Sequence, residues 1–330
     1  MGCSPYSFDR DWIYLILEPM PEVKIAILGY GSQGRAWAMN LKDSGCDIVI
    51  GLPVRDRARL QARRDGWSGI KTVSAATSLA DIIIMAFPDH LHGRVFAIDI
   101  APYLKTGAAI VFLHGFSVHF KTLIPPKHCD IILLAPLGPG AAVRSKYLED
   151  GSVGFFHALF QNGSGHAKQI LNYLVKNLKI GRTALIKTTF AEEAVGDLFG
   201  EQAVLCGGLS QLILTGFETL TRAGLAPDKA YLEVCYQLDL IIDLIKRHGL
   251  EGMFKRISVA ARYGSFLNGR KIIDRATRKN MKRILDDIKS GRFARQLNAL
   301  TDHKLKKLDK DLKKMTNPSF EKSVRKFSDS

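Results

Sequence analysis

The first half of the chain alternates short runs of apolar residues with longer stretches of helical periodicity. The apolar runs are Lys24–Leu28, Asp47–Ile50, Ile82–Ala86, Ala109–Leu113 and Ile131–Leu134. Runs that are apolar almost throughout and alternate with helices are typical of parallel strands that are buried on both faces. The pattern therefore predicts a doubly wound α/β domain with a mainly parallel sheet over residues 23–189.

The strand-like runs stop after Thr189. Apolar residues then recur at helical spacing, with breaks at Gly224–Pro227 and at His248–Gly249. Glycine and proline at these points are typical of helix ends. We therefore predict an all-helical domain over residues 190–308, with an N-terminal extension at 1–22 and a basic C-terminal tail at 309–330.

Charge is concentrated near the C-terminus. The formal net charge is +15, and the last sixty residues contain 18 Lys and Arg against 8 Asp and Glu. The most basic stretch, residues 304–314, mixes lysines with leucines and acids at helical spacing and contains no aromatic residue. This pattern favours a solvated amphipathic helix over a nucleic-acid-binding arm.

The longest apolar stretch, residues 195–217, has the length of a membrane span. Polar residues interrupt it at four positions: Asp197, Glu201, Gln202 and Gln211. We therefore expect a buried helix and no membrane insertion. The five cysteines have no CxxC spacing, which favours reduced thiols and a cytoplasmic location.

A glycine-rich turn follows the first predicted strand directly and precedes a predicted helix. It consists of Gly29, Tyr30, Gly31, Ser32, Gln33 and Gly34. Strand, GxGxxG turn and helix in this order form the Rossmann-type dinucleotide-binding motif, in which the helix N-terminus holds the pyrophosphate. All six residues are therefore candidate cofactor contacts.

The end of the second predicted strand indicates which nicotinamide cofactor binds. Arg55, Arg57 and Arg59 follow this strand, where an NAD site usually has an acid. The arginines suit the 2′-phosphate of NADPH, whereas Asp56 leaves NADH possible. In the alternative interpretation the arginines are only the solvated start of a helix.

Two pairs of polar residues at i, i+4 spacing lie in the helical half. Asp197 and Glu201 form one pair, and Glu233 and Gln237 form the other. Each pair lies on one helix face, and the apolar residues around Glu233 predict that this face is buried. We expect the glycines near Asp197 to admit a second backbone. The acids are candidate metal ligands, although acids that stabilise a helix dipole or pair with arginine have the same spacing.

The glycine turn, His114-Gly115-Phe116, Gly138-Pro139-Gly140 and the segment DLFGEQAVLCGG starting at Asp197 together resemble the ketol-acid reductoisomerase family. The resemblance extends from Val23 to about Leu308 and is to the short form of the family. It implies a Rossmann-type domain followed by a knotted helical domain, and a homodimer in which both subunits build each active site. It also implies a two-step reaction, in which Mg²⁺-assisted alkyl migration precedes reduction of a keto acid by NADPH.

By the same resemblance, Asp197 would bridge two Mg²⁺ ions, Glu201 would bind one of them, and Glu233 of the partner chain would bind the other. Ser258 would hold the substrate carboxylate, and His114 would lie beside the nicotinamide and the metal site. Pro88, Asp89, His114 and Gly140 would complete the cofactor site.

Three positions differ from the family pattern. Leu137 replaces a lysine, Gln237 replaces a metal-binding glutamate, and Arg262 stands where an acid is expected. Since the lysine and the glutamate belong to the catalytic centre, we expect alkyl migration to be impaired and reduction to be better preserved. The alternatives are a fully active reductoisomerase of branched-chain amino acid biosynthesis and a non-catalytic dinucleotide-binding paralogue.

Overall fold

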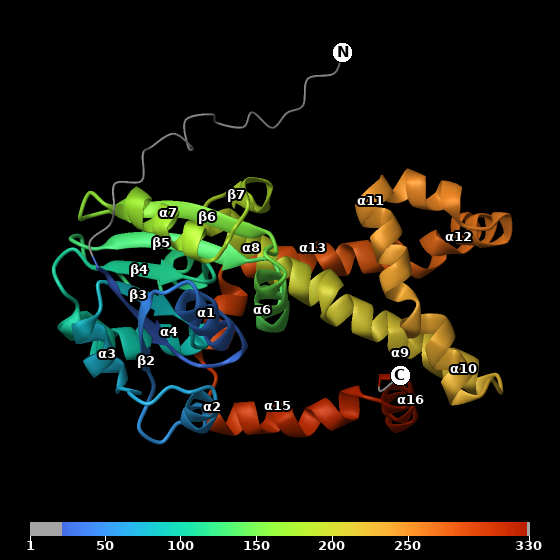
Figure 1. Cartoon of the computed structure of the whole chain (residues 1–330). Helices are drawn as coiled ribbons and strands as arrows, with labels where there is room; N and C mark the ends of the chain where they lie inside the picture. Colours follow the sequence, from blue (N-terminus) through green and yellow to red (C-terminus); the bar gives the residue numbers. More distant parts are fainter. Residues whose placement is uncertain (1–21, 329–330) are drawn as a thin grey trace, which may run out of the picture. The chain divides into compact units, whose positions relative to one another are not determined.

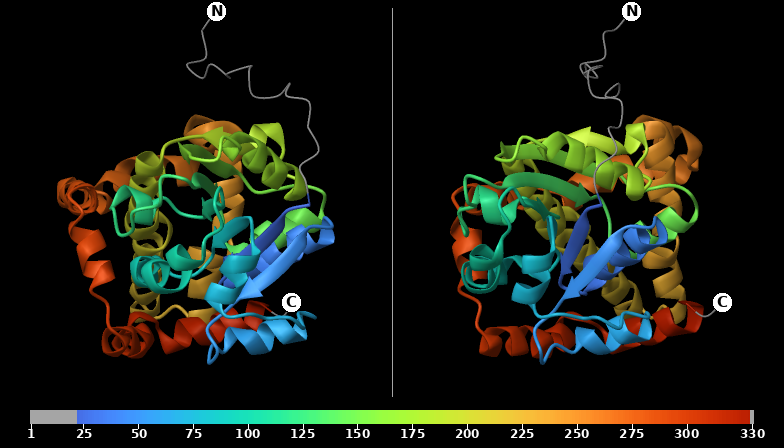
Figure 2. Two further views of the ribbon diagram at one scale, coloured as in Figure 1. Left: turned by 90° about the vertical axis from the view of Figure 1, so that its left-hand side faces the viewer. Right: turned by 60° about the vertical axis from the view of Figure 1, so that its left-hand side comes forward.

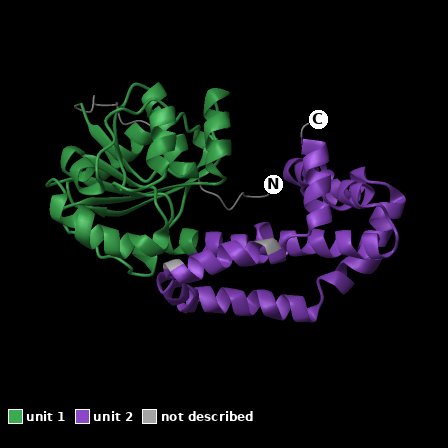
Figure 3. Cartoon of the chain, turned by 90° about the horizontal axis from the view of Figure 1, so that it is seen from below, with its two compact units in different colours: residues 1–194 green, residues 195–330 purple. Residues whose placement is uncertain are grey.

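The computed structural model of the chain describes residues 22–328, apart from the side chains of residues 302 and 313. The N-terminal extension and Cys3 therefore lie outside the described residues, except for Glu22. The chain divides into two compact units, residues 1–194 and 195–330 (Figure 3). The boundaries that we predicted after residues 189 and 308 stay predictions.

Unit 1 contains one seven-stranded sheet. Its strands are β1 (Lys24–Leu28), β2 (Asp47–Gly51), β3 (Ile82–Met85), β4 (Ala109–Phe112), β5 (Asp130–Pro136), β6 (Phe155–Asn162) and β7 (Leu185–Lys187). The strand order is β2-β1-β3-β4-β5-β6-β7, and all neighbours are parallel except β5 and β6. The five predicted strands are confirmed, whereas β6 and β7 were not predicted.

Helices cover both faces of this sheet (Figures 1 and 2). They are α1 (Ser32–Asp43), α2 (Ala58–Arg64), α3 (Val73–Leu79), α4 (Asp89–Val95), α5 (Phe116–His119), α6 (Gly140–Leu148) and α7 (Ala167–Asn177), with a π-helical turn at Phe96–Ile100 and 3₁₀ turns at Ala101–Tyr103 and Arg182–Ala184. In β1, Ile25 and Ile27 belong to one buried cluster, and Ala26 and Leu28 belong to another. Successive residues thus enter cores on opposite faces, as a doubly wound sheet requires.

Beyond β7 the described chain is helical. The elements are α8 (Phe190–Gly200), α9 (Gly207–Arg222), α10 (Pro227–Tyr231), α11 (Leu238–Arg256), α12 (Val259–Ile272), α13 (Arg275–Lys289), α14 (Arg292–Asn298), α15 (Asp302–Met315) and α16 (Pro318–Ser328), with π-helical turns at Glu201–Leu205 and Leu232–Tyr236. The predicted breaks are confirmed, because α9 ends at Arg222 and Gly249 kinks α11 with φ 67°. The knot stays a prediction.

Helix α16, near the C-terminus, packs on the rest of unit 2. Phe320 and Phe327 of α16 pack on Tyr231 of α10, with ring centroids 5.5 and 5.9 Å apart. Ser323 donates its hydroxyl to Asp228 at 2.9 Å, and Lys326 forms an ion pair with Asp228. These contacts make α16 part of the small core of unit 2, whereas α15 has the amphipathic, exposed character that we expected.

The prediction of a buried apolar helix over residues 195–217 is wrong for the isolated chain. The helical stretch Phe190–Arg222 is long and apolar enough to cross a membrane, and only 11% of its most apolar window is buried. Val204, Leu205 and Leu212 are 49%, 67% and 52% exposed. Sequence apolarity predicts burial, but it does not say whether the covering surface belongs to the same chain.

Candidate active site

The glycine turn joins β1 to α1 and is closed by backbone contacts that allow no side chain at two positions. A Cβ atom on Gly29, where φ is 102°, would lie 2.4 Å from the carbonyl oxygen of Ala86. A Cβ atom on Gly34 would lie 2.3 Å from the carbonyl oxygen of Gly29. These glycines let the turn fold back tightly on the sheet, as the dinucleotide motif requires.

The middle glycine of the turn serves a different purpose. A Cβ atom on Gly31 would meet nothing within 4 Å. Gly31 is the N-cap residue of α1, and no side chain caps this helix. The open space before uncapped N–H groups fits the pyrophosphate of a dinucleotide, which binds helix N-termini.

The turn is also tied to the loop that follows β5. Gln33 donates its side-chain N–H to the Gly138 carbonyl oxygen at 2.8 Å. A Cβ atom on Gly140 would lie 2.0 Å from the Ser32 carbonyl oxygen. The position of Leu137 therefore depends on the same contacts that shape the cofactor turn.

Tyr30 contributes to the turn mainly as a packed side chain. It is 4% exposed, and its hydroxyl donates to Asp65 at 2.9 Å and accepts from Trp67 at 2.8 Å. Burial and the Asp65 carboxylate raise the pKa of its hydroxyl, which stays protonated. Arg35 of α1 binds the same carboxylate through two N–H groups.

The three arginines after β2 do not have equal environments. Arg59 donates to the carbonyl oxygens of Leu52 and Pro53 at 2.8 Å, so it stabilises the loop. Arg55 and Arg57 are exposed. Arg55 and Arg57 are therefore better candidates than Arg59 for a contact with a 2′-phosphate.

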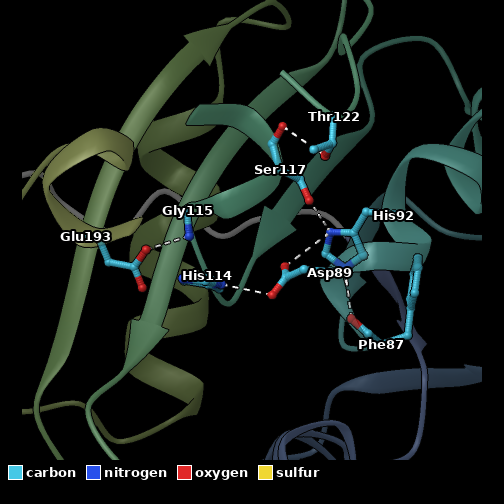
Figure 4. Close-up of polar contacts among 8 residues, drawn as sticks. All are labelled: Phe87, Asp89, His92, His114, Gly115, Ser117, Thr122 and Glu193. Carbon is cyan, nitrogen blue, oxygen red and sulfur yellow. Dashed lines mark hydrogen bonds and ion pairs between the residues drawn. The ribbon is translucent and has the colours of Figure 1, made fainter. Parts of the chain in front are cut away.

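His114 and Asp89 meet at the carboxyl ends of β4 and β3, which are neighbours in the sheet. Nδ1 of His114 lies 2.9 Å from Oδ2 of Asp89 (Figure 4). Burial opposes ionisation of Asp89, but the hydrogen bond from His114 outweighs it and holds the pKa of Asp89 below its usual value. Asp89, which we assigned to the cofactor site, thus binds a predicted catalytic residue through its carboxylate.

Glu193 is a site residue that the sequence interpretation missed. It is 5% exposed, and its Oε2 accepts the backbone N–H of Gly115 at 2.5 Å (Figure 4). This bond fixes the backbone directly after His114. The signal was present in the sequence, because Glu193 precedes Asp197 by four residues and so lies on the same face of α8.

Asp197 and Glu201 lie one turn apart, at the end of α8 and the start of the π-helical turn Glu201–Leu205. Both are exposed. The expected approach of a second backbone at the glycines near Asp197 stays a prediction. Cβ atoms on Gly207 and Gly208 would lie 2.1 Å from the carbonyl oxygens of Gln202 and Ala203, so these glycines accommodate the wider π-helical turn.

Glu233 lies in a second π-helical turn, Leu232–Tyr236, and Gln237 follows it. The prediction that this face is buried is wrong for the isolated chain, because both side chains are exposed. The i, i+4 pairing is confirmed, since Nε2 of Gln237 lies 3.3 Å from Oε2 of Glu233. Within residues 22–328 no three acidic, histidine or cysteine side chains gather as a metal centre.

Ser258 is the N-cap residue of α12, and its oxygen accepts the backbone N–H of Ala261 at 3.1 Å. The hydroxyl proton can still be donated to a substrate carboxylate. Arg262 lies on the exposed first turn of the same helix. Leu137 is 45% exposed, and its backbone N–H binds the carbonyl oxygen of Gly154 at 2.8 Å.

Comparison with known proteins gives the same family for both units. The NADPH-binding domain of acetohydroxy acid isomeroreductase matches residues 19–183. The C-terminal domain of ketol-acid reductoisomerase matches residues 190–329. The similarity thus continues well past Leu308, where we expected it to end.

Solved structures agree. The chain is 34% identical to an NADH-preferring ketol-acid reductoisomerase from an uncultured archean, with a TM-score of 0.86 over 92% of this chain and 94% of the other. An NAD-binding semialdehyde dehydrogenase protein from Cupriavidus necator shares the fold at 19% identity, with a TM-score of 0.62 over 82% and 99% of the two chains. A putative oxidoreductase from Jannaschia sp. CCS1 does so at 16% identity, with a TM-score of 0.60 over 82% and 98%.

Proposed function

Since the chain belongs to the ketol-acid reductoisomerase family and is an NAD(P)-dependent oxidoreductase of that type, we propose that it reduces a 2-keto-3-hydroxy acid with NADPH and Mg²⁺. We propose further that its alkyl-migration step is impaired. The reduction moves a hydride from the nicotinamide to the keto carbon, and the keto oxygen takes up a proton. The observation that carries the second proposal is the aliphatic side chain of Leu137.

Leu137 leaves the catalytic loop without the cation that the family has there. Its side chain packs toward Gly154, where a Cβ atom would lie 3.0 Å from Cδ1 of Leu137. Alkyl migration builds negative charge on substrate oxygens, and loss of one positioned donor typically raises such a barrier by about 2.7–4 kcal/mol. Reduction needs mainly a bound cofactor and an oriented, polarised carbonyl.

We assign Asp197, Glu201 and Glu233 as the Mg²⁺ ligands. Carboxylate oxygens are the hard donors that this ion prefers, and the exposed pair of Asp197 and Glu201, where α8 meets the π-helical turn, leaves room for the waters that the ion keeps. Bound there, Mg²⁺ would act as a Lewis acid on the keto and hydroxyl oxygens of the substrate. Gln237 offers an amide oxygen in place of a fourth carboxylate, so the set carries less negative charge.

NADPH is the cofactor that Arg55 and Arg57 favour, because both guanidinium groups are exposed beside the predicted ribose position. Asp56 is less suited to hold a ribose hydroxyl, because its Oδ1 accepts the N–H of Ala58 at 2.8 Å. The relative with 34% identity is described as NADH-preferring. For this chain we propose the opposite preference, and the two exposed arginines of this loop are what supports it.

A homodimer with shared active sites accounts for the exposed apolar surface of unit 2. Leu205 and Leu212 near α9, Leu240 of α11 and Phe266 of α12 are each more than half exposed. Surfaces of this kind in a soluble enzyme are normally covered by another chain. Glu233 lies beside this surface, so we assign it to the active site of the partner subunit. Free thiols at four described cysteines fit a reducing cytoplasm.

The test follows NADPH oxidation with Mg²⁺ present and compares 2-acetolactate with its migrated isomer, 3-hydroxy-3-methyl-2-oxobutanoate. We expect turnover of the isomer and slow or absent turnover of acetolactate. Equal turnover of both compounds would show an ordinary reductoisomerase of branched-chain amino acid synthesis. NADPH binding without turnover of either compound would show a different substrate or a non-catalytic paralogue.

A further inference from the structure

The sheet register brings Asp89 and His114 together at one edge. In the parallel pairing of β3 with β4, Met85 is the partner of Phe112, so both strands end at the same level. Asp89 opens α4 shortly after β3, and His114 follows β4. Two strand ends thus deliver a carboxylate and an imidazole to one place (Figure 4).

A second histidine lies close to this carboxylate, but its own contacts exclude it from an ion pair. Nε2 of His92 lies 2.9 Å from the backbone oxygen of Phe87, which can only accept a hydrogen bond. The proton of neutral His92 is therefore on Nε2, and Nδ1 accepts the hydroxyl of Ser117 at 2.7 Å. Burial lowers the pKa of His92 and keeps it neutral.

Nδ1 of His92 and Oδ1 of Asp89 lie 3.6 Å apart. Since neither atom then carries a proton, the two form no hydrogen bond with each other. Asp89 thus makes its close hydrogen bond to His114. Because an ionised carboxylate only accepts, Nδ1 of His114 must carry the proton that lies between them. The tautomer of His114 is set by this neighbour.

Two further contacts hold the imidazole and its backbone. The ring of His114 lies nearly parallel to the buried ring of Phe116, with an interplanar angle of 28° and centroids 6.0 Å apart. Glu193 holds the N–H of Gly115. Ring plane, backbone and tautomer are therefore each constrained by a different residue.

We propose that Asp89 is a positioning residue for His114, which keeps the imidazole proton on Nδ1 and so makes Nε2 the nitrogen that carries the lone pair. The proposal rests on the proposed function, because that function gives His114 its place beside substrate and cofactor. An Nε2 lone pair can accept a proton from a substrate hydroxyl or a bound water. With the proton on Nε2, neutral His114 could not do so.

Replacement of Asp89 by asparagine tests this role with little change of shape. An asparagine N–H can donate to Nδ1 and so stabilise the opposite tautomer. In serine proteases the corresponding replacement lowers kcat about 10⁴-fold by that route. For Asp89→Asn we expect kcat for reduction to fall at least about 10²-fold, which is the usual size of a general acid–base contribution.

The experiment uses the full-length chain labelled with [¹⁵N]histidine. Long-range ¹H–¹⁵N spectra report the tautomer of each of the nine histidines, and a His114→Gln variant assigns the His114 signals. Wild type, Asp89→Asn and Asp99→Asn are compared for these spectra, kcat, KM and the Kd of NADPH. Asp99 provides the matched charge control, since it lies on the same connection between β3 and β4.

The expected result is an Nδ1–H tautomer in wild type and in Asp99→Asn, and a changed tautomer in Asp89→Asn with an NADPH Kd that stays within about threefold. An unchanged tautomer would overturn the proposal. So would a loss of activity that only reflects weaker NADPH binding, or a changed tautomer with unchanged kcat. Absence of turnover in wild type would refute the proposed function, whereas the spectra would still decide whether Asp89 sets the tautomer.

Discussion

The side-chain amide of Gln237 donates to Oε2 of Glu233 at 3.3 Å, one helical turn away. Both groups are exposed and lie at the second π-helical turn of unit 2. The amide carries no charge. Glu233 therefore has a neutral neighbour at the position where the family resemblance implies a second carboxylate. The residue at position 237 therefore decides whether the proposed metal site has three carboxylates or four.

Gln237→Glu should tighten Mg²⁺ binding about tenfold or more, because the added carboxylate stands beside Glu233 and raises the charge around the ion. Without the ion, two like charges at i, i+4 should lower the free energy of unfolding by about 0.2–0.5 kcal/mol. Isothermal titration with Mg²⁺ and denaturant unfolding measure the two effects. Gln296→Glu, at an exposed position of α14, is the charge control, and equal Mg²⁺ affinity in all three proteins would refute the metal assignment.

Leu137→Lys should restore alkyl migration selectively. The side chain is 45% exposed, so a lysine can be accommodated. We expect the rate with 2-acetolactate to rise about 10²-fold relative to the rate with its migrated isomer, since one positioned donor is worth about that factor. Leu137→Met supplies similar volume without charge and should leave the ratio unchanged. A parallel rise in both rates would count against a role in migration.

Alanine at two glycines of the cofactor turn should separate folding from binding. In Gly34→Ala the new methyl group would lie 2.3 Å from the Gly29 carbonyl oxygen, so we expect a loss of several degrees in Tm. In Gly31→Ala it would meet nothing within 4 Å, so Tm should stay within about one degree. Titration of intrinsic fluorescence should nevertheless show at least about tenfold weaker NADPH binding by Gly31→Ala. If Gly31→Ala bound NADPH as tightly as the wild type, the pyrophosphate would have to bind away from Gly31.

His157 on β6 should make the stability of the chain fall in mild acid. Burial, with a contribution from Lys187, lowers its pKa to about 4. The unfolded chain takes up this proton near pH 6.5, so the contribution is complete above pH 6.5 and is lost as pH falls toward 4. The expected loss is about 3 kcal/mol. His157→Leu should flatten the pH dependence of the unfolding free energy over this range, and an equal slope in both proteins would contradict the assignment.

The five predicted strands follow from local sequence, because each is buried on both faces and therefore apolar at nearly every position. Strand β6 escaped prediction because its second half, from Leu159 to Asn162, is largely exposed and carries polar residues. Strand β7 is only three residues long, and its central residue, Ile186, is exposed and does not enter a core. Periodicity detects burial, so strands that are partly exposed or very short give a weak pattern.

The sequence by itself determined the class of fold, the glycine turn, the family and the i, i+4 pairs, since each depends on residues that are close in the chain. Only the tertiary structure showed that Asp89 holds His114, that Glu193 holds Gly115, that Arg59 stabilises a loop, and that Glu233 is exposed. The first two relationships join residues far apart in sequence, the Arg59 contacts depend on the path of the loop, and the exposure of Glu233 depends on what covers a surface. They are decided by strand register and packing, which no local pattern encodes.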